Sequence, residues 1–229
     1  NVDAKAGGIH LQPLEHRCQR LDRALKVDHL AGEAKDTERD IGVGVEEVVL
    51  DLVVNHSSDE HFWFQEARKS RENPYRNYYH WWNAEDGKPP KRWSFFDVKG
   101  DAWKYDARTD AYYLHISSVK QPDLNWENPK LREEVYDAVR FWFDKGVDGF
   151  RMDVITFISK DLPFRELPAE YNGNFVQYYA DGPHRHEYLQ EFNREVLSKY
   201  DVMTVAEGPG TTTENVLDYV DEARGELNM

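Results

Sequence analysis

The chain has little of three features that define large classes of protein. One cysteine, Cys18, among 229 residues excludes an internal disulfide and favours a cytoplasmic protein. No apolar run approaches the roughly 18 residues of a membrane-spanning helix, so we expect no membrane partner. Basic residues are outnumbered by acidic ones, 29 to 43, and the net charge of −14 disfavours nucleic acid as a partner. Residues 1–61 also lack Phe, Trp and Tyr, although 14% of the chain is aromatic.

The most informative segment that is present runs from Gly146 to Val154, with the sequence GVDGFRMDV. It is typical of a short strand, whose side chains alternate between two faces, so that Arg151 and Asp153 share one face. A guanidinium beside a carboxylate favours the charged carboxylate, which suits a nucleophile or an electrostatic stabiliser. Taken alone, the segment is equally compatible with a structural ion pair.

Two other short apolar runs also end in polar residues. Residues 47–56 (EVVLDLVVNH) close on Asn55 and His56, and residues 201–207 (DVMTVAE) close on Glu207 before a Gly-Pro-Gly break. Both runs are nearly continuous in apolar character, as strands buried on both faces are. Because the carboxyl ends of parallel barrel strands meet on one face, we expect these residues to form one site with Arg151 and Asp153.

The segments between these runs predict a parallel α/β sheet. Apolar residues recur at helical spacing between Pro129 and Gly146, again at about 187–199, and once more from about Thr213. About 90 residues separate the first two strands, far more than a crossover needs. This stretch is dense in aromatic residues, proline and asparagine. We interpret residues 57–126 as a small irregular subdomain, with a short β pairing around 111–116 and its own aromatic core.

Four motifs together resemble the α-amylase superfamily of glycoside hydrolases. They are DLVVNH (51–56), QPDLN (121–125), GFRMD (149–153) and VAE (205–207), and the second is typical of the oligo-1,6-glucosidase and α-glucosidase branch. The resemblance covers about residues 47–229. It implies a partial (β/α)8 TIM barrel with an irregular subdomain inserted after the third strand. Residues 46–56 would be a barrel strand, 57–126 the insertion, and 127–229 the continuation of the barrel.

The resemblance also implies roles for the polar residues. Asp153 would be the nucleophile and Glu207 the general acid and base of a retaining mechanism, in which the carboxyl groups lie roughly 5–5.5 Å apart. Arg151 would hold Asp153 charged and oriented, and His56 would bind a sugar hydroxyl. Gln121 would line the same pocket, although a loop-closing hydrogen bond is an alternative for it.

The remaining motif residues would support or tune the site. Asp51 and Asn55 are expected to be structural rather than catalytic. Val154 resembles enzymes of this branch that prefer α-1,6 bonds, and a methyl-scale difference there is worth about 1–3 kcal/mol. The implied substrates are short α-gluco-oligosaccharides, cleaved in an exo fashion. Two alternatives stay open: a transglycosylase or isomerase on the same scaffold, and a non-catalytic remnant of the family.

The chain departs from the family pattern in two respects. The family has a third carboxylate, in a His-Asp pair on a later strand, and no such pair follows Glu207. We therefore expect a fragment that is inactive by itself. Residues 1–45 match nothing expected of the family, stay unassigned, and are interpreted as not authentic barrel sequence. No cofactor or metal is implied; the family's calcium or magnesium loop would lie in the missing N-terminal part.

Overall fold

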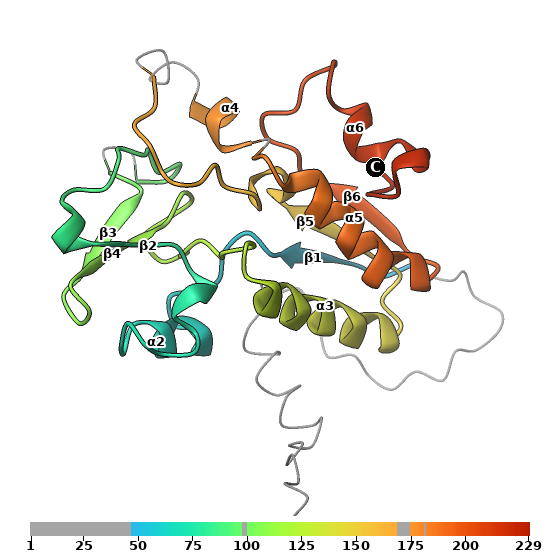
Figure 1. Ribbon diagram of the computed structural model, residues 1–229. Helices are drawn as coiled ribbons and strands as arrows, with labels where there is room; N and C mark the ends of the chain where they lie inside the picture. The colour runs from blue at the N-terminus through green and yellow to red at the C-terminus, as the bar shows by residue number, and fades with distance from the viewer. Residues whose placement is uncertain (1–46, 98–99, 169–174, 181) are drawn as a thin grey trace, which may run out of the picture.

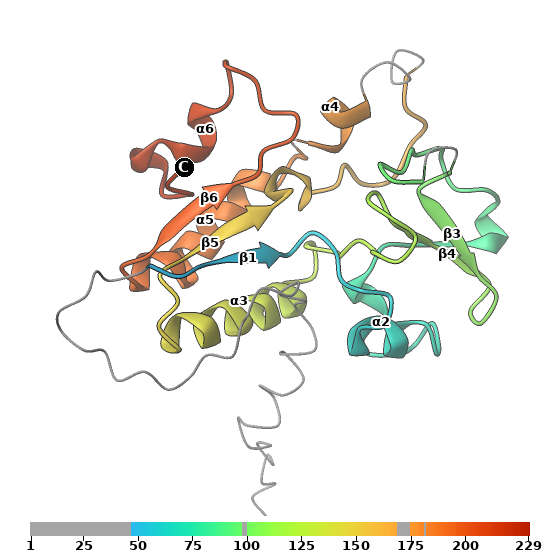
Figure 2. The same ribbon diagram turned by 180° about the vertical axis from the view of Figure 1, so that it is seen from behind.

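The computed structural model describes residues 47–97, 100–168, 175–180 and 182–229. The segment left unassigned above, residues 1–45, lies outside this described part. Within the described part, no helix is both long enough and apolar enough to cross a membrane. Figures 1 and 2 show two groups of strands, a parallel sheet with helices and a smaller antiparallel sheet beside it.

The elements follow the chain in a simple order. The strands are β1 (Val49–Val53), β2 (Trp81–Asn83), β3 (Trp103–Asp106), β4 (Ala111–Leu114), β5 (Gly149–Asp153) and β6 (Met203–Ala206). The α-helices are α2 (Phe62–Ala67), α3 (Pro129–Asp144), α4 (Phe175–Tyr179), α5 (Arg185–Glu195) and α6 (Leu217–Val220). Short 3-10 turns lie at Arg76–Tyr78, Ala84–Asp86, Ile155–Phe157, Leu197–Lys199 and Glu222–Arg224.

The parallel sheet has the strand order β1-β5-β6, which confirms the predicted parallel α/β arrangement. In its register Asp51 lies opposite Arg151, and Arg151 lies opposite Val205. Each strand falls inside the run that predicted it. β1 is less buried than expected, with Val49 39% exposed, because it lies at the edge of this sheet.

One face of the sheet is apolar and is covered by helices. Phe150 and Met152 are at most 1% exposed, whereas their neighbours Arg151 and Asp153 are partly exposed on the opposite face. Helices α3 and α5 lie on the same side of the sheet (Figure 1), and Phe143 of α3 meets Phe150 edge-on at 5.1 Å. The predicted alternation in β5 is therefore confirmed, and it turns the charged residues away from the helices.

The helix ends follow from local chemistry. The Asn128 side chain caps α3 by accepting from the Lys130 N–H at 3.0 Å, Pro129 occupies the first turn, and Gly146 takes a φ of +89° after the last turn. The second predicted helix does not continue to residue 199. It ends at Glu195 because Val196 leaves the helical region, at φ −130° and ψ −70°. The third, expected from Thr213, is helical only from Leu217.

Residues between β1 and α3 form the antiparallel sheet, with the order β2-β4-β3. β4 coincides with the predicted pairing around 111–116. The aromatic residues of this region are divided between two buried clusters: Phe64, Tyr78 and Tyr79 belong to the same cluster as Leu52 and Val54 near the end of β1. Trp103 of β3 belongs to the second cluster, with Leu114 and Ile116 of the same region and with Phe157 and Tyr179 from beyond β5, so the expected separate core is found only in part.

Gly149 makes possible the close approach of β5 to β6. A Cβ added at this glycine would lie 2.4 Å from the Met203 carbonyl oxygen. We expect Gly149→Ala to lower the free energy of unfolding by about 1–3 kcal/mol, because a backbone atom cannot move aside. Urea unfolding measures this. Adding Met203→Ala should give no rescue, since the clash is with the backbone, and wild-type stability of Gly149→Ala would contradict the prediction.

His61 couples folding stability to pH. Its Nδ1 caps α2 by accepting from the Trp63 N–H at 3.0 Å, and burial lowers its pKa to about 4. The unfolded chain, with a histidine pKa of about 6.5, binds more protons between these values, so stability is lost as pH falls from 6.5 towards 4. His61→Asn keeps a capping side chain and should remove about 3 kcal/mol of this pH dependence. Urea unfolding at pH 7 and pH 4 tests it; equal pH dependence in both proteins would refute it.

Candidate functional site

The predicted site residues cluster at the carboxyl ends of the parallel strands. In both ribbon views these ends of β1 and β5 point towards the side that carries the antiparallel sheet (Figures 1 and 2). The face that turns away from α3 and α5 presents Asp51, Arg151 and Asp153. Glu207 follows β6 directly, and its backbone N–H donates to the Met152 carbonyl at 2.9 Å. The strand ends thus bring together side chains that lie up to 156 residues apart in the sequence.

Arg151 is the centre of this cluster. Its Nη1 donates to Asp51 Oδ1 and to Asp153 Oδ1, each at 2.8 Å, and its Nη2 lies 2.8 Å from Glu207 Oε2. Partial burial would lower the pKa of the guanidinium, but the hydrogen bonds to Asp51 and Asp153 outweigh it and raise that pKa. One planar cation therefore contacts three carboxylates from three strand segments. Contact with the same guanidinium limits how far apart Asp153 and Glu207 can lie.

Val154 has an unusual backbone immediately after Asp153. Its φ of 38° and ψ of 41° place it in the left-handed region, where a β-branched residue is a steric outlier costing about 1–3 kcal/mol. In this conformation its N–H donates to Glu207 Oε2 at 3.0 Å. Glu207 is therefore held from two sides, by the guanidinium of Arg151 and by a backbone amide next to Asp153.

His56, Gln121 and Asn55 form the second part of the cluster. His56 Nε2 lies 3.0 Å from Gln121 Nε2, and His56 Nδ1 lies 3.4 Å from Asn55 Nδ2. Burial lowers the pKa of His56, while the charges of Asp123 and Asp153 act in the opposite direction and that of Lys160 lowers it further. His56 is thus neutral at neutral pH, and it lies close enough to Asp153 for the charge of that carboxylate to act on its pKa.

Gln121 reaches His56 because the QPDLN segment runs alongside the end of β1. His56 and Asp123 form an antiparallel bridge, and the Ser57 N–H donates to the Pro122 carbonyl at 3.1 Å. All eight residues predicted for the site therefore lie in two hydrogen-bonded groups, one around Arg151 and one around His56. Asp51 and Asn55 enter these groups as partners of Arg151 and His56.

Sequence reasoning missed two residues of the cluster, Lys160 and Asp123. Lys160 is 5% exposed and its Nζ lies 2.9 Å from Asp123 Oδ2, while Asp123 is fully buried. Asp123 stands inside the QPDLN motif, of which only Gln121 was predicted for the site. Lys160 is the one charged residue of the segment ITFISK but is followed directly by Asp161, so there was little signal for it in the sequence.

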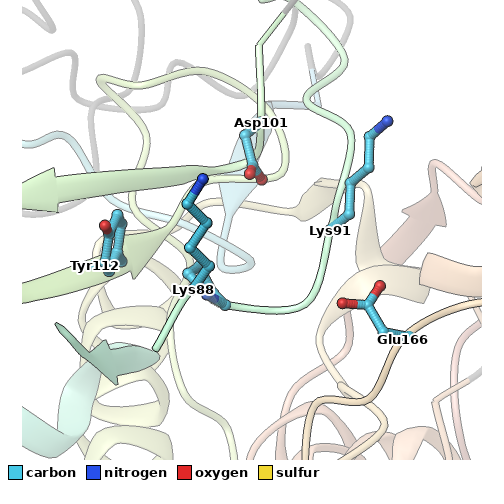
Figure 3. Close-up of a pocket in the computed structure, with 6 residues that line it drawn as sticks. Lys88, Lys91, Asp101, Tyr112 and Glu166 are labelled. Carbon is cyan, nitrogen blue, oxygen red and sulfur yellow. The ribbon is translucent and has the colours of Figure 1, made fainter. Parts of the chain in front are cut away.

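A hollow of about 450 Å³ lies elsewhere, and Figure 3 shows the side chains around it. It is lined by Lys88, Pro89, Lys91, Asp101, Tyr112 and Glu166. The lining has two lysines and two carboxylates, so it favours neither an anionic nor a cationic ligand, and it includes none of the predicted site residues. Among the described residues, no group of three or more His, Cys, Asp or Glu side chains could hold a metal ion.

Solved structures of similar proteins share this fold. Trehalulose synthase MutB, in a variant bound to Tris, superposes with a TM-score of 0.77 at 46% identity over 80% of this chain and 33% of that one. An inactive variant of the same enzyme, in complex with isomaltulose, superposes with the same TM-score at 45% identity and the same coverage. The three-stranded sheet and its helices are thus part of an α/β barrel of this type.

Sequence relatives agree with the structural ones. The oligo-1,6-glucosidase of Parageobacillus thermoglucosidasius is 58% identical over 185 residues, which cover 80% of this chain and 33% of the relative. That of Heyndrickxia coagulans is 52% identical over 211 residues, covering 89% and 38%. The chain therefore spans about a third of the length of the curated relatives that it matches.

A family model covers most of the chain. The model described as "Alpha amylase, catalytic domain" matches residues 34–229. The match begins upstream of residue 46, inside the segment left unassigned from the sequence. Together with relatives that are more than half identical, it shows that this chain belongs to the α-amylase family, in the branch of the oligo-1,6-glucosidases and α-glucosidases.

Proposed function

We propose that this chain carries the catalytic pair of a retaining exo-α-glucosidase that hydrolyses α-glucosidic bonds of short gluco-oligosaccharides. The observation that carries the proposal is the contact of one guanidinium with both Asp153 and Glu207. This contact is compatible with the roughly 5–5.5 Å between carboxyl groups that a covalent, retaining mechanism uses. We take α-glucosides as the substrates because the relatives described above are named for their action on α-glucosides.

The two carboxylates would act in sequence. Asp153 attacks the anomeric carbon and forms a glycosyl ester, while Glu207 gives its proton to the leaving oxygen. Glu207 then takes a proton from water, which attacks the same carbon and releases Asp153. Two displacements restore the configuration of the substrate. The side chains of Asp153 and Glu207 are 22% and 43% exposed, so both have access to a substrate and to water.

The neighbouring residues would prepare this pair. Arg151 holds Asp153 charged and in place, because its Nη1 donates a charge-assisted hydrogen bond to Asp153 Oδ1. His56 binds a hydroxyl of the sugar that is cleaved off, and Gln121 lines the same subsite. Asp51 positions Arg151 from the adjacent strand, and Asn55 supports His56.

Val154 and the names of the relatives favour α-1,6 bonds. The Val154 side chain follows the nucleophile directly and is partly exposed, where it can contact the unit that leaves. Trehalulose synthase among the similar structures supports the second candidate, an isomerase or transglycosylase in which a sugar replaces water as the acceptor.

Several finer features belong to the same proposal. β1 is the third strand of the barrel, residues 57–126 form a subdomain inserted after it, and residues 127–229 continue the barrel. The reaction needs no cofactor. The single cysteine favours a cytoplasmic enzyme.

The test is a chimera, because the chain spans a third of its relatives. The matching segment of the Parageobacillus thermoglucosidasius oligo-1,6-glucosidase is replaced by the 185 aligned residues of this chain. We expect hydrolysis of isomaltose with α-glucose as the first product, observed by NMR. First release of β-glucose would overturn the retaining mechanism, and a folded but inactive chimera would favour the non-catalytic alternative. Transfer of glucosyl units to sugars in preference to water would favour the isomerase.

A further inference from the structure

Lys160 has a buried ammonium group that the proposed mechanism does not use. It follows the short helical turn Ile155–Phe157 after β5, and only 4% of its side chain is exposed. Its Nζ lies 2.7 Å from Asn55 Oδ1, 2.5 Å from the Phe157 carbonyl and 2.9 Å from Asp123 Oδ2. An ammonium has N–H donors and no acceptor; it donates to the oxygens of Asn55 and Phe157 and forms an ion pair with Asp123.

The charge on Lys160 is supported by Asp123. Burial lowers the pKa of the amine, and the carboxylate of Asp123 opposes this effect. Asp123 is itself held in place, since its Oδ1 accepts from the Ile116 N–H at 3.0 Å. The ammonium thus joins three separate parts of the chain: the end of β1, the QPDLN segment and the turn after β5.

The contact with Lys160 fixes the orientation of the Asn55 amide. Because the ammonium can only donate, the oxygen of that amide must face Lys160, and its Nδ2 must face His56. Nδ2 is also only a donor, so His56 Nδ1, 3.4 Å away, must accept. A neutral imidazole with an accepting Nδ1 carries its proton on Nε2.

Gln121 must adapt to this arrangement. An amide nitrogen of Gln121 cannot face a protonated Nε2 of His56, whereas turning the amide by a half rotation places its oxygen there instead. Within the described residues, the Gln121 side chain makes no other hydrogen bond that would oppose this rotation. Asn55 has no such freedom, because turning its amide would direct Nδ2 at the ammonium.

We propose that Lys160 is a positioning residue which, through Asn55, holds His56 as the tautomer with its proton on Nε2. A sugar hydroxyl that takes the place of the Gln121 amide at Nε2 must then accept this hydrogen bond and keeps its own proton to donate elsewhere. Only this last consequence rests on the proposed function. The tautomer is a property of the chain without substrate.

The tautomer is measured by NMR on the full chain with ¹⁵N-labelled histidine, without sugar, at a pH above 7. A protonated ring nitrogen has a pyrrole-type ¹⁵N shift and an unprotonated one a pyridine-type shift. The signals that disappear in the spectrum of His56→Gln are assigned to His56. We expect the pyrrole-type shift at Nε2 of His56 in the wild-type chain, and a pyrrole-type shift at Nδ1 would overturn the proposal.

Two variants test the separate steps. Lys160→Met with Asp123→Asn removes both buried charges, so that neither is left unpaired, and frees the Asn55 amide to turn. We expect an Nδ1-protonated population of His56 to appear, and an unchanged Nε2 tautomer would overturn the role of Lys160. Asn55→Asp keeps the contact with Lys160 but offers His56 only acceptors, so it should place a proton on Nδ1. An unprotonated Nδ1 in that variant would exclude Asn55 as the link.

An internal control separates a local change from loss of the fold. His61 Nδ1 accepts from the Trp63 N–H, so His61 should keep its proton on Nε2 in every folded variant. If the paired variant loses the His61 signal as well, it has unfolded, and the wild-type and Asn55→Asp results decide the matter. A chimera that hydrolyses isomaltose with His56 protonated on Nδ1 would keep the proposed function and reject this inference. An inactive chimera with the Nε2 tautomer would do the reverse.

Discussion

Replacing Asp153 with asparagine in the chimera is expected to lower kcat for isomaltose by at least about 10⁴-fold. The amide has nearly the shape of the carboxylate but cannot form a stable glycosyl ester, so the covalent route is closed. Binding should change much less than kcat, because the hydrogen bond from Arg151 Nη1 can still reach the remaining oxygen at position 153. Steady-state kinetics with a nitrophenyl α-glucoside measure both parameters.

A variant with a smaller side chain at position 153 tests whether the carboxylate of Asp153 is the nucleophile. Asp153→Gly leaves a space for a small anion, and azide in that space should attack the anomeric carbon once. The product would be a β-glucosyl azide, since a single displacement inverts an α-glucoside. Azide that restores turnover with an α product, or turnover by Asp153→Asn within tenfold of the parent chimera, would reject Asp153 as the nucleophile.

Arg151→Met is expected to lower kcat/KM by at least about 10³-fold and to move the acid limb of its pH profile to higher pH. The substitution leaves Asp51, Asp153 and Glu207 grouped around a neutral side chain, where the structure has a guanidinium within 2.8 Å of each. One carboxylate then takes up a proton more readily, because this relieves the repulsion of like charges. Rates from about pH 4 to pH 8 would show the shift.

Arg151→Lys is the matched control for that experiment. It keeps the charge but loses the planar fork that reaches three carboxylates at once. The rate should fall, while the acid limb should stay near its original position. If Arg151→Met leaves the acid limb unmoved, repulsion among the carboxylates does not limit the reaction. Thermal unfolding of both variants shows whether the fold is kept.

The sequence predicts the parallel sheet and the residues of the cluster because both follow from patterns within short segments of the chain. Period-two alternation alone places Arg151 and Asp153 on one face, and the polar ends of three apolar runs predict that Asn55, His56 and Glu207 lie nearby. Helix boundaries were predicted where capping is local, as at Asn128 and Gly146.

Features that depend on tertiary contacts could not be predicted in the same way. Lys160 and Asp123 pair across 37 positions with no periodic pattern between them. The left-handed backbone of Val154 contradicts the preference of its residue type, and its N–H donates to Glu207, which lies 53 positions away in the sequence. The early end of α5 at Glu195 interrupts apolar spacing that by itself favours a continuous helix.

The pairing of Asp51 with Arg151 has a consequence for how faithfully the sheet must assemble. A shift of β5 by one residue against its neighbours would turn every side chain of the strand to the other face. Phe150 and Met152 would then point into the cluster, and Arg151 would be buried under α3 and α5 without its carboxylates. A chimera molecule with this register error would lack the whole charge network, so the specific activity of a chimera preparation would fall with the fraction of such molecules.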